Sequence, residues 1–128
     1  MTSRPRFPHL RNVVVQRYTS NPLLIGGHKF DCRVYIAITN INPLIVYVYD
    51  EGLARFASQP FAAPTTENEA NAQMHLTNFA VNSGPNHHIQ RLENGQTSKW
   101  ALSELFAYLE KHPPHGFSGV SARETAIH

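Results

Sequence analysis

Residues 22–57 have the sequence PLLIGGHKFDCRVYIAITNINPLIVYVYDEGLARFA, in which three charged residues alternate with apolar ones inside a long apolar segment. Lys29, Asp31 and Arg33 are spaced two apart, so an extended backbone places all three on one face. An unpaired ion in a low-dielectric interior costs on the order of several kcal/mol. Two cations beside one carboxylate therefore indicate a polar ligand on this face. A row of salt bridges within the sheet is the alternative.

The same stretch predicts a β-hairpin. Residues 30–39 and 44–50 are rich in β-branched and aromatic residues, and the loop NINP separates them. Before the hairpin, Gly26 and Gly27 predict a turn rather than a phosphate-binding loop, because no longer glycine motif accompanies them.

Pairing Thr39 with Leu44 across the predicted loop sets the register of the hairpin. Arg33 would then lie opposite Asp50, and Lys29 would lie opposite Ala54. In that register Arg55 points away from Lys29, unless a bulge at Gly52 shifts the alternation of side chains.

The rest of the chain divides into simpler segments. The sequence predicts an irregular lead-in at residues 1–11, a buried strand at residues 12–18, and polar surface loops at residues 62–73 and 83–98. It predicts a helix at residues 98–112 and a tail over residues 112–128. The short segment HLTNFAVN (75–82) is ambiguous between helix and strand.

Composition predicts one domain in a chain of 128 residues, with 41% apolar and 16% charged residues. The net charge of +2 comes from scattered basic residues, so we expect no nucleic-acid arm. We expect no membrane association either, because the longest apolar run is far too short to span a bilayer. The single cysteine, Cys32, has apolar neighbours and predicts a buried, unreactive thiol. These features together predict a cytoplasmic protein.

Familiar catalytic and metal-binding signatures are missing. The eight histidines have neither a cysteine pair nor an HExxH spacing beside them, so we expect scattered surface histidines and no metal site. No GxSxG, GxGxxG or GxxxxGK[ST] motif occurs.

Five sequence blocks carry a resemblance to a known family. They are VVVQRY (13–18), NPLLIGGHKFDCRVY (21–35), NPLIVYVYDEGLARF (42–56), MHLTN (74–78) and KWALSELFAYL (99–109). Their order and spacing across residues 12–111 resemble the tubulin-tyrosine-ligase-like family of ATP-dependent amino-acid ligases. The motifs NPLLIGG and EGLARF are most similar to those of the glutamate-adding branch. The resemblance implies an α+β chain that forms the central part of an ATP-grasp fold, with a mostly antiparallel sheet and at least one flanking helix.

The resemblance assigns one group of residues to the nucleotide. Its members match the adenine hinge, the nucleotide-contacting pair of the KFD block and the pair within HLTN; they are Gln16, Arg17, Tyr18, Thr19, Lys29, Asp31, Thr77 and Asn78. Arg33 matches a position close to the reacting groups, which implies a catalytic role. His75 is a neighbour of this site for which a structural role is equally well supported.

A second group matches the pocket for the incoming amino acid. Arg55 corresponds to the arginine that grips the carboxylate, a task that suits the paired donors of guanidinium. Phe79 and Ala80 stand where the family commonly has a tyrosine and a serine, which leaves glycine as an alternative to glutamate. Lys99 is a further candidate for this pocket, and a solvated lysine at a helix start is its alternative.

The implied reaction joins an amine to a carboxylate activated by ATP as an acyl phosphate. The cofactors are ATP and magnesium, with magnesium ligands expected outside this chain, because the family's metal-binding carboxylates have no counterpart among its residues. The implied partners are glutamate and tubulin or microtubules, and the implied location is the cytoskeleton, extending to the cilium, flagellum or basal body. Alternatives are glycine or tyrosine ligation, a non-catalytic protein that binds nucleotide or tubulin, and a structural remnant.

Overall fold

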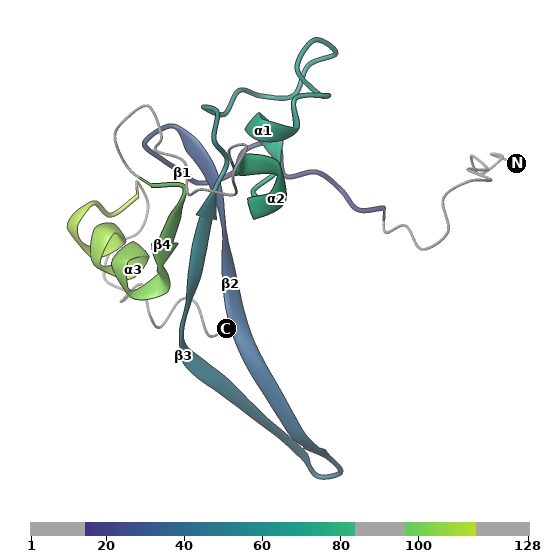
Figure 1. The fold of residues 1–128 in the computed structure, drawn as a ribbon, viewed down its shortest axis with the longest axis vertical. Coiled ribbons are helices and arrows are strands. Elements are labelled where there is room, and N and C mark those ends of the chain that lie inside the picture. The colour runs from purple at the N-terminus through teal and green to yellow at the C-terminus, as the bar shows by residue number, and fades with distance from the viewer. Residues whose placement is uncertain (1–14, 84–96, 115–128) are drawn as a thin grey trace, which may run out of the picture.

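A computed structural model describes residues 15–83 and 97–114 of the chain (Figure 1). The elements, in chain order, are β1 (Leu24–Ile25), β2 (His28–Ile41), β3 (Leu44–Phe56), α1 (Ala72–His75), α2 (Phe79–Asn82), β4 (Lys99–Ala101) and α3 (Leu102–Lys111). The four strands form one sheet in the order β1-β2-β3-β4, and every neighbouring pair is antiparallel. The predicted α+β class is thereby confirmed. The expected lead-in (1–11) and the tail after residue 114 lie outside the described residues.

A tight turn joins β1 to β2. Ile25 pairs with His28, so only Gly26 and Gly27 lie between the strands. Their φ angles are 58° and 80°, a left-handed pair that glycine adopts without steric cost and that matches the twist of a hairpin. The prediction of a turn from these two glycines is confirmed.

The long hairpin of β2 and β3 differs from the prediction in its length and its register. The loop contains only Asn42 and Pro43, joined by a cis peptide bond, because Ile41 already pairs with Leu44. The register also shifts between Val34 and Ile36 and again between Ile38 and Asn40. Predicted pairings based on a four-residue loop were therefore wrong.

The corrected register changes which charged residues lie opposite one another. Arg33 pairs with Leu53 instead of Asp50, and Asp31 pairs with Arg55. Directly opposite residues of an antiparallel pair share a face, so Arg55 lies on the same face as the alternating charges of β2. The predicted orientation of Arg55 away from Lys29 was wrong, since the sequence does not reveal where the register shifts occur.

At Gly52 the backbones of β2 and β3 leave no room for a side chain. A Cβ atom built on Gly52 would lie 2.4 Å from the backbone oxygen of Arg33 and 3.3 Å from Cδ2 of Leu102. Real Cβ atoms do not come so close to a backbone oxygen. Glycine is therefore required here by the approach of two backbones.

Helix α3 covers the face of the sheet opposite the charges. Phe56 is 1% exposed and packs between Phe30 and Trp100, with ring centroids 5.6 and 4.8 Å away. Leu105 of α3, also 1% exposed, belongs to the same cluster, and Tyr108 of α3 meets Trp100 edge-on at 5.5 Å. Burial of these apolar surfaces is the main force that joins helix and sheet.

Three further expectations require correction. The segment that begins the predicted helix forms strand β4 first, because Lys99 and Trp100 pair with β3. Of the predicted buried strand 12–18, the described part, residues 15–18, is exposed and not extended into a sheet. Cys32 is exposed rather than buried. Local desolvation of its sulfur, together with the Asp31 carboxylate, raises the pKa of the Cys32 thiol, so it remains a weak nucleophile.

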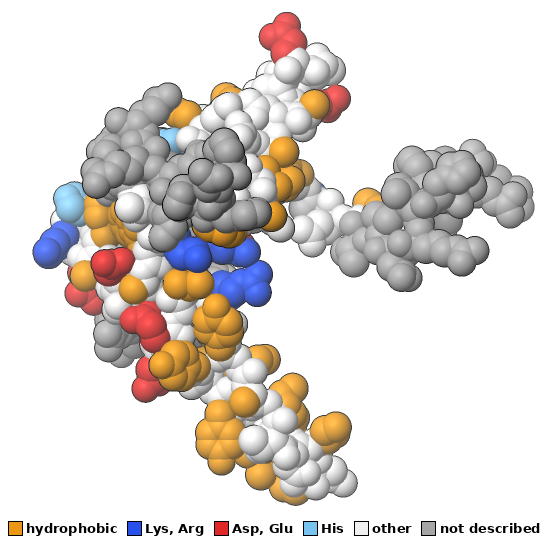
Figure 2. Space-filling model, in the orientation of Figure 1, with side chains coloured by type: hydrophobic (Ala, Val, Ile, Leu, Met, Phe, Trp, Pro, Cys, Tyr) orange, Lys and Arg blue, Asp and Glu red, His pale blue; other side chains and the backbone are white. Residues whose placement is uncertain are grey.

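The outer half of the hairpin exposes apolar side chains on both faces, because consecutive strand residues such as Tyr47 and Val48 are both exposed. Figure 2 shows part of this apolar surface at the narrow end of the molecule. Ile41 is 83% exposed and Leu44 is 66% exposed. A surface of this kind is typical of a contact with further protein. None of the helices in the described ranges has the length and apolar character needed to cross a membrane.

Glu51 connects the hairpin to the first turn of α3. One of its carboxylate oxygens accepts hydrogen bonds from the backbone N–H groups of Gly52 (2.9 Å) and Ser103 (3.1 Å), and the other accepts one from Ser103 Oγ (2.7 Å). These hydrogen bonds lower the pKa of Glu51, and the bond from the Gly52 N–H group has the largest effect. Glu104 completes the helix start by accepting a hydrogen bond from Ala101 N at 2.8 Å.

We expect Gly52→Ala to destabilise the protein by about 2 kcal/mol, because the added methyl group forces β3 away from β2 and α3. Urea unfolding followed by circular dichroism measures this. Gly27→Asn is the matched control: its Cβ meets no atom within 4 Å, and asparagine tolerates the left-handed backbone. Equal stability of Gly52→Ala and the wild type would contradict the close approach.

We expect Glu51→Gln to lower the melting temperature at pH 7, and we expect this difference to vanish in acid. Because folding lowers the pKa of Glu51 below its ordinary value of 4.5, the carboxylate stabilises the fold above that pH and ceases to do so as pH falls through the lowered pKa. Thermal melts between pH 7 and pH values below about 4 measure the effect. Glu110→Gln, on the exposed side of α3, is the control and should change little at any pH.

Candidate functional site

A row of charged residues crosses the sheet on the face opposite α3. Asp31 of β2 pairs with Arg55 of β3, and Arg55 pairs with Lys99 of β4. Lys29 and Arg33 flank Asp31 on the same face of β2, since alternate residues of a strand point the same way. Figure 2 shows basic side chains gathered over this part of the sheet. The row, here called the charged face, unites five residues predicted for the site from the sequence.

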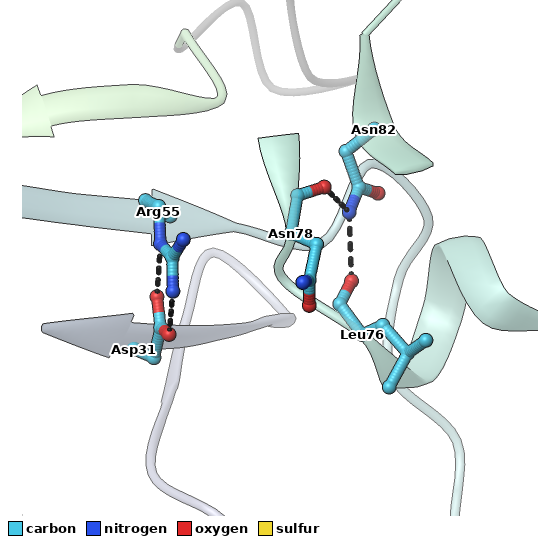
Figure 3. A network of polar contacts seen from close by, with 5 residues as sticks. All are labelled: Asp31, Arg55, Leu76, Asn78 and Asn82. Atoms are coloured by element: carbon cyan, nitrogen blue, oxygen red, sulfur yellow. Dashed lines mark hydrogen bonds and ion pairs between the residues drawn. The ribbon is translucent and has the colours of Figure 1, made fainter. Parts of the chain in front are cut away.

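Asp31 and Arg55 form a two-pronged ion pair (Figure 3). Arg55 Nε donates to one oxygen of Asp31 at 2.9 Å, and Arg55 Nη2 donates to the other. Their side chains are 17% (Arg55) and 39% (Asp31) exposed, so the pair contributes about 1 kcal/mol or less to stability. Hydrogen bonding to Asp31 raises the pKa of Arg55. The geometry shows that the Arg55 guanidinium presents two parallel donors to a carboxylate.

Lys99 joins the charged face to helix α2. Its Nζ lies 4.6 Å from the centroid of the Phe79 ring, a cation–π contact. Phe79 is the first residue of α2, and Ala80 follows it at an exposed position. The structure thus brings Arg55, Lys99 and Phe79 together, and their role in an amino-acid pocket stays a prediction.

Lys29 is held at the other end of the charged face. Its Nζ donates a hydrogen bond to the backbone oxygen of His75 (3.0 Å) and lies 4.2 Å from the centroid of the Tyr18 ring. An ammonium group has three N–H donors, so this arrangement leaves donors available to a ligand. Two predicted nucleotide residues, Tyr18 and Lys29, are therefore in direct contact.

Four predicted residues, Arg33 of the charged face among them, have no side-chain hydrogen bond, ion pair or ring contact with another described residue. Gln16, Arg17 and Thr19 are exposed in the segment before β1. Arg33 is also exposed, and its guanidinium forms no ion pair or hydrogen bond with another described residue. Their roles remain predictions.

Thr77 and Asn78 lie in the short connection between α1 and α2, where Asn82 organises the backbone (Figure 3). The Asn82 side chain donates to the backbone oxygens of Leu76 (2.7 Å) and Asn78 (3.1 Å) and accepts from the N–H and Oγ of Ser58 (2.7 and 2.8 Å). Asn82 is 2% exposed and Thr77 is 8% exposed. Asn78 is exposed, and its side-chain amide bonds to no other described residue.

His75 and Asn82 are the residues whose importance is least evident from the sequence. His75 is 6% exposed and His28 is 1% exposed, so the expected surface location of the histidines was wrong for these two. The Nδ1 atom of His28 donates a hydrogen bond to the backbone oxygen of Ala57 at 2.9 Å. The signal in the sequence is the amide of Asn82 directly after the apolar residues 79–81, since the network uses the backbone oxygen of Asn78 and not its side chain. Burial of an amide makes such bonds necessary.

Metal-ligating side chains do not gather within the described residues. No group of three or more histidine, cysteine, aspartate or glutamate side chains is close enough there to hold a metal ion. Asp31, the carboxylate of the charged face, is engaged by Arg55. The described residues therefore do not fit a magnesium site by themselves.

Comparison with known proteins gives consistent matches over most of the chain. The profile of the tubulin-tyrosine ligase family matches residues 2–119. Tubulin polyglutamylase TTLL13 from Homo sapiens is 45% identical over 102 residues, which cover 79% of this chain and 12% of that protein. Tubulin polyglutamylase ttll-5 from Caenorhabditis elegans is 38% identical over 101 residues (77% and 14%), and probable tubulin polyglutamylase TTLL2 from Homo sapiens is 45% identical over 97 residues (75% and 16%). The chain thus spans less than a fifth of the length of these relatives.

We expect Asn82→Ala to destabilise the protein by about 2 kcal/mol, because it removes four hydrogen bonds made by a side chain that is only 2% exposed. Asn78→Ala is the matched control and should leave stability unchanged, since it removes an exposed amide that bonds to no described side chain or backbone group. Chemical unfolding of both variants measures the difference. Equal losses in the two variants would show that Asn82 does not organise this connection.

Proposed function

Because the chain belongs to the tubulin-tyrosine ligase family, we propose that it forms part of an ATP-dependent ligase that adds glutamate to carboxylates of tubulin. The observation that carries the proposal is the charged face, on which Lys29, Asp31, Arg55 and Lys99 lie side by side next to Tyr18 and Phe79. The glutamate assignment is supported by the relatives, whose names describe tubulin polyglutamylases.

The nucleotide would bind at the end of the charged face formed by Tyr18 and Lys29. Lys29 offers N–H donors to phosphate oxygens. Arg33 is a second cation for this site, because it is exposed on the same face of β2, two residues beyond Asp31. Cations that are fixed before the reaction stabilise the charge that develops on a transferring phosphoryl group. We propose that Gln16, Arg17 and Thr19 add contacts to the base, and Thr77 and Asn78 to the rest of the nucleotide.

The amino acid would bind at the other end, near Arg55 and Lys99. Arg55 already holds the Asp31 carboxylate with two donors, which supports a role in gripping a carboxylate of similar shape. Phe79 provides a ring under the Lys99 ammonium but no hydroxyl, and Ala80 provides none either. Ligation of glycine or tyrosine is the alternative within the same fold.

The reaction we propose activates a protein carboxylate as an acyl phosphate, after which the amine of the incoming glutamate displaces phosphate. Magnesium supplies charge neutralisation of the phosphates when it is bound. Its ligands are proposed to lie outside the described residues, which hold no suitable cluster. The partners follow from this reaction: ATP, glutamate, and tubulin or microtubules of the cytoplasm, cytoskeleton or cilium.

A second candidate function is binding of nucleotide or tubulin without catalysis. The observation that favours it is the arrangement around Lys29, whose ammonium group keeps N–H donors available to phosphate oxygens whether or not any transfer follows. The two candidates differ in one measurable respect: only a ligase transfers glutamate.

We expect the 128-residue protein to bind magnesium-ATP in a calorimetric titration, and we expect Lys29→Ala to weaken binding by about tenfold to a hundredfold. Loss of a charge-assisted hydrogen bond accounts for a change of this size. Lys111→Ala is the matched control, because Lys111 is exposed at the end of α3, on the layer opposite the charged face.

Transfer of radiolabelled glutamate or glycine to tubulin, measured on the same samples, separates the candidates. Glutamate transfer supports the ligase, and binding without transfer supports the non-catalytic alternative. A folded protein whose affinity for magnesium-ATP is the same with and without Lys29 contradicts the proposed nucleotide site.

A further inference from the structure

We propose that His75 is a positioning residue that fixes the Lys29 ammonium group against the Tyr18 ring, ready to contact the phosphates of the nucleotide. This inference rests on the proposed function for its ligand, but its structural content concerns three residues that are already in contact. His75 does not face the charged row with its side chain. It would act through Tyr18 and through its own backbone oxygen.

Both nitrogens of the buried His75 ring are occupied. Nε2 lies 3.1 Å from the backbone oxygen of Asn68, which can only accept, so Nε2 carries the proton and donates. In the neutral ring Nδ1 is then an acceptor, and it receives the hydrogen bond of the Tyr18 hydroxyl at 2.9 Å. Phe61 packs edge-on against the same ring, with centroids 6.0 Å apart. The ring therefore has one orientation and one tautomer.

A fixed His75 ring fixes two groups around Lys29. The first is the Tyr18 ring, which meets His75 edge-on and presents its face to the Lys29 ammonium at 4.2 Å. The second is the backbone oxygen of His75, which accepts a hydrogen bond from Lys29 Nζ at 3.0 Å. Helix α1 has only four residues, too few to hold that carbonyl in place by its own hydrogen bonds.

The alternative is that His75 merely stabilises the loop around Asn68. Asn68 is itself anchored, with its side chain accepting from Thr65 N (2.8 Å) and donating to the oxygen of Ala63 (2.9 Å). A purely structural role predicts lower stability in His75 variants but no change at Lys29 in the folded protein. A positioning role predicts a change at Lys29 even where stability is nearly retained.

The experiment uses two variants that differ in what they remove. His75→Phe keeps an aromatic ring and removes all three side-chain hydrogen bonds, the one with Tyr18 and the two with Asn68. Tyr18→Phe keeps the ring over Lys29 and removes only the bond to Nδ1, so it serves as the second variant if His75→Phe does not fold. NMR of the lysine ε-methylene groups, with the Lys29 signal assigned from Lys29→Arg, reports the upfield shift that the Tyr18 ring imposes.

We expect the upfield shift of Lys29 to be lost in His75→Phe and reduced in Tyr18→Phe. In calorimetry each variant should bind magnesium-ATP about three- to tenfold more weakly, the effect of one hydrogen bond. The double variant should bind no more weakly than His75→Phe alone, since both changes break the same contact.

Two results have opposite meanings. An unchanged Lys29 signal and unchanged ATP affinity in folded variants would overturn the inference and leave His75 a structural residue. A lost Lys29 signal in a protein whose wild type binds no ATP would support the positioning role and contradict the proposed nucleotide function. The experiment can therefore contradict the positioning role of His75 and the proposed nucleotide function independently of each other.

Discussion

The backbones of β2 and β3 meet at Gly52, and the geometry of the charged face depends on that meeting. Only a residue without a Cβ lets β3 lie against the oxygen of Arg33 while Leu102 packs from the other side. Between Gly52 and the end of β3, the register pairs Arg55 of β3 with Asp31 of β2. Arg55 also pairs with Lys99 of β4 on its other side. A shift by one residue would turn Arg55 to the face covered by α3. Close backbone packing therefore decides which side chains can share a ligand.

Two polar residues give the site region its order where regular structure is scarce. Helices α1 and α2 have four residues each, so neither is stable through its own hydrogen bonds. Asn82 binds the backbone between them, and His75 ties Tyr18 to Asn68. In this segment, hydrogen bonds of buried side chains hold the backbone in place, as backbone hydrogen bonds do in the sheet.

The layers of the protein explain why the charged face is open. Helix α3 buries Phe56 and Trp100 on one side of the sheet, which leaves the other side for the polar residues. Beyond the charged face, the hairpin continues as a two-stranded ribbon (Figure 1) with exposed apolar residues on both of its faces. A two-stranded ribbon with such surfaces is marginally stable alone. A surface of this kind is typical of a contact with further protein.

The amino-acid sequence alone determined the class of the fold, the hairpin, the Gly26–Gly27 turn, the body of helix α3 and the family. These features are encoded locally, in the alternation of Lys29, Asp31 and Arg33, in glycines with positive φ and in the five sequence blocks. The tertiary structure alone decided the pairing of Asp31 with Arg55, the strand at Lys99 and the burial of His75. Register shifts and contacts between distant residues depend on how backbones and side chains fit in three dimensions, and local patterns carry no record of that fit.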